Sequence, residues 1–205
     1  MRGLNNNRHF GYFFNWFYPN YFEVVNKTLN AYFDDDEVVQ VVFKFLAELV
    51  LNRNNRIRFD TWNINGLIVF KESSKYVVQL LQLYDCFNKK PVKNNIYKEI
   101  FKYIKIIVEI FNNAITGNFV NFAICEFYND QVFSVTSEMV FKAIVSQEQD
   151  LIKGYDKIYS SIFTMTSHFF KFHLETLFLK FDLALIEKIL KFLIGGFSDN
   201  KFDIQ

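Results

Sequence analysis

The sequence predicts an all-α fold, a helical-repeat solenoid built from antiparallel helix hairpins. Apolar residues recur at intervals of three and four along most of the chain, which is the spacing of one helix face. The 205 residues include only 2 Pro and 7 Gly, so breakers are scarce and a turn-rich β sandwich is disfavoured. Short polar clusters with capping residues separate the periodic segments. With 51% hydrophobic residues, the chain can bury one core or one continuous repeat array, and we expect no second domain.

The first hairpin is predicted between residues 14 and 53. Its first helix is expected over 14–33, with apolar residues at helical intervals. Asp34 is the expected N-cap of the second helix, and Glu37, three residues later, completes a capping box. The second helix, expected to end near Asn52, carries an apolar stripe of Val39, Val42, Leu46, Leu49 and Val50. Because only a short acidic run joins the two helices, they should pack antiparallel.

The second hairpin is predicted between residues 63 and 117. Asn63 is the expected cap of a helix whose apolar face is interrupted by the polar segment 71–75. Pro91 lies in the following loop. The next helix repeats apolar residues from Ile100 to Ile115, and Gly117 supplies its C-terminal stop.

The remaining chain predicts two further repeats, over residues 119–146 and 150–197. Shorter helices are expected around 120–128 and 132–145, followed by one long helix from Leu151 to Phe169. The last helix should start near Asp182 and stop at Gly195 and Gly196.

Periodicity alone does not separate a closed bundle from an open superhelix. Two features favour the solenoid: the hairpins recur about every 40 to 50 residues, as in HEAT-type repeats, and several helices are apolar on more than one face. We therefore predict one HEAT-like array over residues 1–205, a piece of a longer solenoid, with hairpins stacked in a right-handed superhelix. Its approximate repeats are 14–53, 63–117, 119–146 and 150–197.

The charge balance points to protein partners. The formal net charge is +1, which offers no concentrated basic surface for nucleic acid or an anionic membrane. No uninterrupted apolar run reaches the roughly 18 residues that a membrane span requires, so we expect no membrane insertion. Cys86 and Cys125 form no metal motif and are expected to be buried small hydrophobes.

The residues that would carry catalysis or bind a metal are missing from the pattern. His9 is isolated, and His168 and His173 are five residues apart, a spacing that places them on different faces of a helix. No Gly-rich phosphate loop, nucleophile elbow or HExxH motif is present. We therefore expect no enzyme activity, and no catalytic, cofactor-binding or metal-binding residue.

One polar loop could have a function. Arg53, Arg56 and Arg58 place three guanidinium groups between two predicted hairpins, and the loop ends in Asp60. As a functional site, it would contact an acidic protein surface, since arginine suits carboxylates and interfaces. The alternative, which we favour, is a structural loop whose arginines bond to helix C-terminal carbonyls or to acids on a neighbouring repeat.

The same region resembles a known family. Residues 44–60 read KFLAELVLNRNNRIRFD and residues 65–75 read NGLIVFKESSK, and both resemble the exportin-7 family, also called Ran-binding protein 16/17. FNWFYP at 14–19 and TGNFVNF at 116–122 are similar too, in the expected order. This chain departs from the family at Asn63-Ile64, where the family tends to have Ser-Pro, and at Phe119, where it has Tyr.

The resemblance implies a segment of a Ran-dependent nuclear transport receptor, an exportin of the importin-β superfamily that carries protein cargo between nucleus and cytoplasm. The implied partners are protein cargo, Ran-GTP and nuclear pore proteins, and the implied location is the nucleus and cytoplasm, with shuttling through the nuclear pore. The similarity, specific over residues 14–130, lies toward the C-terminal half of much longer proteins. Ran-GTP is gripped by N-terminal repeats in this superfamily, so no Ran contact is assigned here. The alternative is a non-transporting helical-repeat scaffold for protein–protein interaction.

Overall fold

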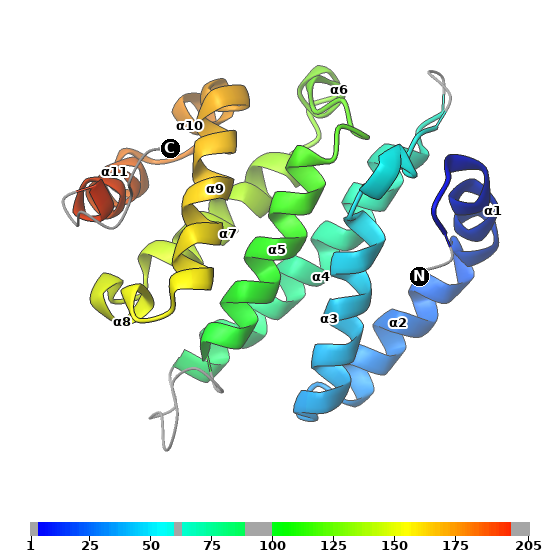
Figure 1. Cartoon of the computed structure of the whole chain (residues 1–205), viewed down its shortest axis with the longest axis horizontal. Coiled ribbons are helices and arrows are strands. Elements are labelled where there is room, and N and C mark those ends of the chain that lie inside the picture. The colour runs from blue at the N-terminus through cyan, green and yellow to red at the C-terminus, as the bar shows by residue number, and fades with distance from the viewer. Residues whose placement is uncertain (1–3, 60–62, 89–99, 198–205) are drawn as a thin grey trace. The chain divides into compact units, whose positions relative to one another are not determined.

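The computed structural model describes residues 4–59, 63–88 and 100–197. Across these ranges the chain forms eleven α-helices and one short 3-10 helix, with no strand (Figure 1). The predicted all-α fold is confirmed. The contacts divide the chain into two compact units, Met1–Leu80 with Glu109–Asp130, and Leu81–Val108 with Gln131–Gln205. The repeat boundaries and the handedness of the superhelix stay predictions.

The first unit is built on helices α1 to α6. These are α1 (Asn7–Phe17), α2 (Asn20–Ala31), α3 (Asp36–Val50), the 3-10 helix η1 (Arg53–Asn55), the first part of α4 (Asn65–Asn88), the second part of α5 (Lys102–Thr116) and α6 (Ala123–Phe127). Its core joins aromatic residues of α1 and α2 to aliphatic residues of α3 and α4, among them Phe10, Phe14, Phe22, Leu46, Val50 and Val69. The expected helix end before Gly117 is confirmed.

The single helix predicted over 14–33 is wrong, because the chain breaks at Pro19. Helix α1 starts at Asn7, where the Asn6 side chain accepts a 2.9 Å hydrogen bond from the His9 N–H. It ends at Phe17, and Tyr18 has an extended backbone. A residue before proline is pushed out of the helical region, which explains the break. Helix α2 then starts directly after Pro19.

The two predicted caps of the first unit have different outcomes. The cap of α3 is Asp35 and not Asp34: Oδ1 of Asp35 accepts from the N–H groups of Glu37 at 2.9 Å and Val38 at 3.2 Å. An N-cap side chain must reach the second or third N–H of the helix, and α3 starts one residue later than predicted. At the start of α4, Asn63 Oδ1 accepts from the Asn65 N–H at 2.7 Å, which is the first N–H of the helix, so Asn63 lies one position before the expected cap site, at which Ile64 stands.

The second unit contains the second part of α4, the first part of α5, and α7 to α11. These last helices are α7 (Val132–Val145), α8 (Gln149–Lys153), α9 (Asp156–Phe172), α10 (Leu174–Lys180) and α11 (Leu183–Phe197). Helix α7 has the predicted bounds. The long helix predicted from Leu151 is wrong, because Gly154 caps α8 and Tyr155 has non-helical angles before α9 begins. Helix α10 was not predicted, since its exposed apolar residues Phe178 and Leu179 obscure the periodicity.

The predicted helix stop at Gly195 and Gly196 is also wrong, because α11 runs through both residues. A Cβ atom at Gly196 would lie 2.2 Å from Cζ of Phe163 and 2.7 Å from the Tyr159 hydroxyl. The glycine therefore lets α11 approach α9 closely. The predicted start is confirmed: Asp182 Oδ1 accepts from the Leu185 N–H at 2.7 Å. Within the described ranges, no helix combines the length and apolar character needed to cross a membrane.

Candidate functional site

The arginine loop, residues 52–59, connects α3 to α4 in the first unit. Its 3-10 helix η1 is followed by Arg56, and Asn54 and Asn55 have positive φ values of 54° and 53°. Asparagine tolerates this left-handed conformation better than most residues. Arg53 and Arg58 are exposed, whereas Arg56 is only 2% exposed. Asp60, the fourth predicted residue, lies outside the described residues.

Arg56 holds the C-terminal end of α3. Its Nε donates to the Leu51 carbonyl at 3.1 Å, and its Nη2 donates to the Glu48 carbonyl. The same Nη2 lies 3.3 Å from Oε1 of the Glu48 side chain. The last carbonyls of a helix have no hydrogen-bond donor within the helix, and they carry a partial negative charge. The buried Arg56 guanidinium supplies both the donors and a positive charge. Arg56 therefore has the structural role expected for a loop arginine that bonds to the C-terminal carbonyls of a helix.

Arg53 and Arg58 are the charges that the loop presents outward. Arg53 has a side chain 64% exposed, with Nη2 3.6 Å from Oε2 of Glu48. An ion pair of this length at the surface is weak, so the Arg53 guanidinium can turn to another carboxylate at little cost. The loop thus combines an anchored arginine with two solvent-facing ones.

Asn52 makes the base of the arginine loop rigid, a role that the sequence reasoning missed. Its Oδ1 accepts from the Ile57 N–H at 2.7 Å, and its Nδ2 donates to the Gly117 carbonyl at 2.6 Å. The signal in the sequence was an asparagine directly after a helix, a residue type that often bonds to nearby backbone. The Gly117 bond was not visible, because it joins residues 65 positions apart.

Asn52 also brings together the segments that carry the family resemblance. The arginine loop contacts the segment after α5 through Gly117, and Gly66 at the start of α4 approaches the same segment so closely that a Cβ there would be 2.0 Å from the Phe119 carbonyl oxygen. The rings of Phe70 and Phe122 pack edge to face at 4.9 Å. Three of the four segments that carry the resemblance, 44–60, 65–75 and 116–122, therefore contact one another within the first unit.

Cys125 lies in the same unit and is buried. Burial, more than the nearby Asp130 carboxylate, raises the pKa of its thiol. The expectation of a buried cysteine is confirmed for Cys125, and a thiol that stays protonated is a poor nucleophile. The side chain of Cys86 lies outside the described residues.

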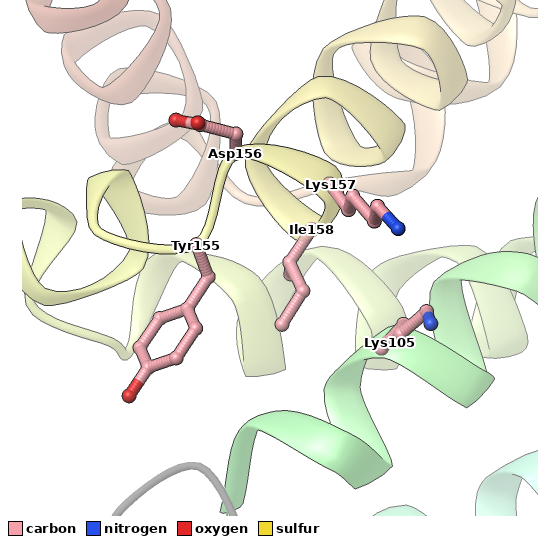
Figure 2. Close-up of a pocket in the computed structure, with 5 residues that line it drawn as sticks. All are labelled: Lys105, Tyr155, Asp156, Lys157 and Ile158. Carbon is pink, nitrogen blue, oxygen red and sulfur yellow. The ribbon is translucent and has the colours of Figure 1, made fainter.

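The second unit contains a pocket of about 420 Å³ (Figure 2). Its described lining residues are Lys105 of α5, with Tyr155, Asp156, Lys157 and Ile158 at the start of α9. The Tyr155 ring packs edge to face on Phe101, with centroids 5.0 Å apart, which gives the pocket a firm aromatic wall. In Figure 2 the Asp156 carboxylate points away from the Tyr155 ring. The lining combines an apolar wall with side chains of opposite charge.

His168 and His173 lie close together at the end of α9. Helix α9 ends at Phe172, so His173 is not on a face of that helix, and its ring centroid lies 6.3 Å from that of His168. The expected separation on two helix faces is therefore wrong. Burial first, and the neighbouring His168 second, lower the pKa of His173 to about 4. No group of three or more His, Cys, Asp or Glu residues in the described part of the chain could hold a metal ion.

Comparisons with known proteins bear on the resemblance directly. The chain is 30% identical over 191 residues to exportin-7 of Dictyostelium discoideum, 25% over 186 residues to exportin-7-B of Xenopus laevis, and 28% over 166 residues to Ran-binding protein 17 of Mus musculus. These matches cover 91%, 91% and 79% of this chain. They cover only 18%, 17% and 15% of the relatives, so the chain spans less than a fifth of their length. No family model and no solved structure matches. The resemblance to the exportin-7 and Ran-binding protein 16/17 proteins is confirmed by these relatives.

Proposed function

We propose that this chain, a homologue of the exportin-7 and Ran-binding protein 16/17 proteins, forms one helical segment of a Ran-dependent nuclear transport receptor. The observation that carries the proposal is the match to exportin-7 of Dictyostelium discoideum, 30% identical over 91% of the chain. Because the chain spans 18% of that relative, transport itself belongs to a longer assembly of repeats, and this segment supplies part of its scaffold.

The proposed mechanism is conformational. Packed helix hairpins can shift slightly against one another, and in a solenoid such shifts add up and couple the binding of two ligands at distant arcs. No covalent chemistry is required, and the segment is proposed not to be an enzyme. The buried Cys125 thiol supports this view, because burial raises its pKa and a protonated thiol is a poor nucleophile.

The proposed partners of the whole receptor are protein cargo, Ran-GTP and nuclear pore proteins, and its proposed location is the nucleus and cytoplasm, with shuttling through the nuclear pore. Within this segment, Arg53 and Arg58 are proposed to contact an acidic protein surface, supported by their exposure and by the anchored base beneath them. The array is proposed to be divided into the repeats 14–53, 63–117, 119–146 and 150–197.

A segment replacement tests the proposal. The part of Dictyostelium discoideum exportin-7 that matches this chain would be replaced by this chain, and the chimera expressed in cells that lack their own exportin-7. We expect the chimera to shuttle between nucleus and cytoplasm and to bind cargo in a Ran-GTP-dependent way. A receptor with the segment deleted is the control. A folded chimera that behaves like the deletion would refute the proposal, and cargo binding indifferent to Ran-GTP would favour the scaffold alternative.

Two further measurements refine the test. The isolated chain should bind Ran-GTP no better than weakly in calorimetry, and a submicromolar complex would contradict the assignment of Ran binding to other repeats. In the chimera, Arg53→Glu combined with Arg58→Glu should weaken capture of acidic protein partners. Unchanged capture would remove the arginine loop from the contact surface.

A further inference from the structure

The pocket between the start of α9 and the first part of α5 carries more positive than negative charge. Its described lining residues include the ammonium groups of Lys105 and Lys157 and a single carboxylate, that of Asp156. Figure 2 shows the Asp156 carboxylate pointing away from both ammonium groups. Within the described residues, no ion pair or hydrogen bond engages the side chain of either lysine. Two ammonium groups therefore stand at this pocket without an acidic partner in the described part of the chain.

The rest of the described lining is apolar. The Ile158 side chain is buried, and in Figure 2 it lies between the Tyr155 ring and Lys105. The Tyr155 ring packs on Phe101, with centroids 5.0 Å apart. The volume of about 420 Å³ is within the range of about 300 to 1,000 Å³ that is typical of small-ligand sites. A single inorganic anion would fill little of that volume, so a ligand that matches the pocket needs an apolar part as well as a negative charge.

We propose that this pocket binds a short acidic segment of a partner protein, in which an acidic and an apolar side chain are two residues apart. In an extended segment, side chains two residues apart point to the same side. The acidic side chain then pairs with Lys105 and Lys157, whereas the apolar side chain packs on Tyr155 and Ile158. The choice of a protein segment over a free organic acid rests on the proposed function, since a transport receptor binds proteins.

The pocket is built from helices inside the described chain. Helix α5 follows α1 to α4, and α9 is followed by α10 and α11, so neither wall is a terminal helix. Lys105 and the start of α9 belong to the same compact unit, the second one. The arginine loop belongs to the first unit, so the pocket is a proposed contact separate from that of Arg53 and Arg58.

Titration of the ¹⁵N-labelled, 205-residue chain with an unlabelled peptide tests the pocket by the shifts of its amide signals. The test peptide is Glu-Ser-Leu-Ser-Glu with both ends blocked. Because its sequence reads the same in both directions, it offers an acidic side chain two residues from leucine in either orientation. We expect a dissociation constant of about 0.1 to 1 mM, since surface ion pairs and one apolar side chain give a weak complex. The largest shifts should fall on Lys105 and on residues 155–158, and binding should weaken as salt screens the charges.

Charge reversal separates the pocket from the rest of the surface. Lys105→Glu combined with Lys157→Glu should weaken binding of this peptide at least about tenfold and should gain binding of Lys-Ser-Leu-Ser-Lys, because the charges at the pocket are then reversed. Lys44→Glu combined with Lys188→Glu is the matched control. Both of these lysines are exposed and lie outside the described lining, and the two changes alter the net charge by the same amount. The control should bind Glu-Ser-Leu-Ser-Glu as the wild type does, and circular dichroism verifies that every variant is folded.

Three results would overturn the proposal. The first is the absence of amide shifts at up to about 2 mM peptide. The second is an equal loss of binding in the pocket variant and the control, which would mean attraction by net charge alone. The third is equal binding of Glu-Ser-Ser-Ser-Glu, glutarate or inorganic phosphate, which would mean a site for small anions. Each of these results would leave the proposed function standing, because the chimera measures transport. A chimera that fails while the peptide still binds would instead reject the receptor and keep the peptide site.

Discussion

Replacing Arg56 by alanine should lower the free energy of unfolding by about 3 kcal/mol. The guanidinium is buried, donates to two carbonyls at the end of α3 and lies beside the Glu48 carboxylate. Each hydrogen bond from a charged donor contributes about 1.5 kcal/mol, and the truncated side chain leaves both carbonyls and a cavity behind. The Glu48 side chain is partly exposed and can turn to water, so the loss should stay below that of a fully buried ion pair.

Urea unfolding of the whole chain, followed by circular dichroism at 222 nm, measures this loss. Arg53→Ala is the matched control, since it removes the same side chain from the same loop at an exposed position and should cost less than about 0.5 kcal/mol. Arg56→Lys should fall between them, because lysine keeps the charge but lacks the planar fork that reaches both carbonyls. Equal losses for Arg56→Ala and Arg53→Ala would refute the view that Arg56 caps α3.

Three other changes test the packing of single elements. Gly66→Ala should lower the free energy of unfolding in urea by at least about 2 kcal/mol, because the added Cβ meets the Phe119 backbone. Gly11→Ala is the control: Gly11 has open space around it, so the change should stabilise the chain by about 0.5 to 1 kcal/mol. A Gly66→Ala variant as stable as the wild type would contradict the close approach of α4 to Phe119. Asp35→Ala should lower the free energy of unfolding by about 1 kcal/mol, and Asp34→Ala by less than half of that, because Asp35 is the N-cap of α3. The reverse order of the two losses would show that Asp34 is the cap. The lowered pKa of His173 means that the unfolded chain takes up a proton between about pH 6.5 and 4 that the folded chain refuses, so stability is complete above this window and falls as pH drops through it. His173→Gln should reduce this fall in the free energy of unfolding by about 1 to 2 kcal/mol, a figure kept low because the His173 ring is not fully buried. Identical pH profiles of unfolding for the wild type and the variant would show that His173 does not cause the fall.

The arginine loop shows how far residue types alone lead toward a site. Three arginines in one polar segment left both a structural and a functional role open. The fold separates them, because only Arg56 reaches the carbonyls of α3 while Arg53 and Arg58 remain at the surface. Identical side chains in one short loop therefore have different tasks, set by which of them the backbone turns inward.

Sequence alone determined the all-α class, the bounds of α7, the start of α11 at Asp182 and the similarity to the exportin-7 proteins. These features are local or cumulative: a cap acts within one turn, a helix face repeats every few residues, and similarity accumulates along the chain. A one-residue shift, such as Asp35 in place of Asp34, is the error expected where adjacent residues are chemically alike.

Only the tertiary structure decided what depends on distant partners. Asn52 bonds to Gly117 across 65 positions, and Gly196 lies inside α11, where Phe163 and Tyr159 leave no room for a Cβ atom. A glycine that ends a helix and one that permits close packing look the same in sequence, since the difference lies in the neighbour and not in the residue. Which face of α11 stays outside was decided in the same way, by the packing of its other face.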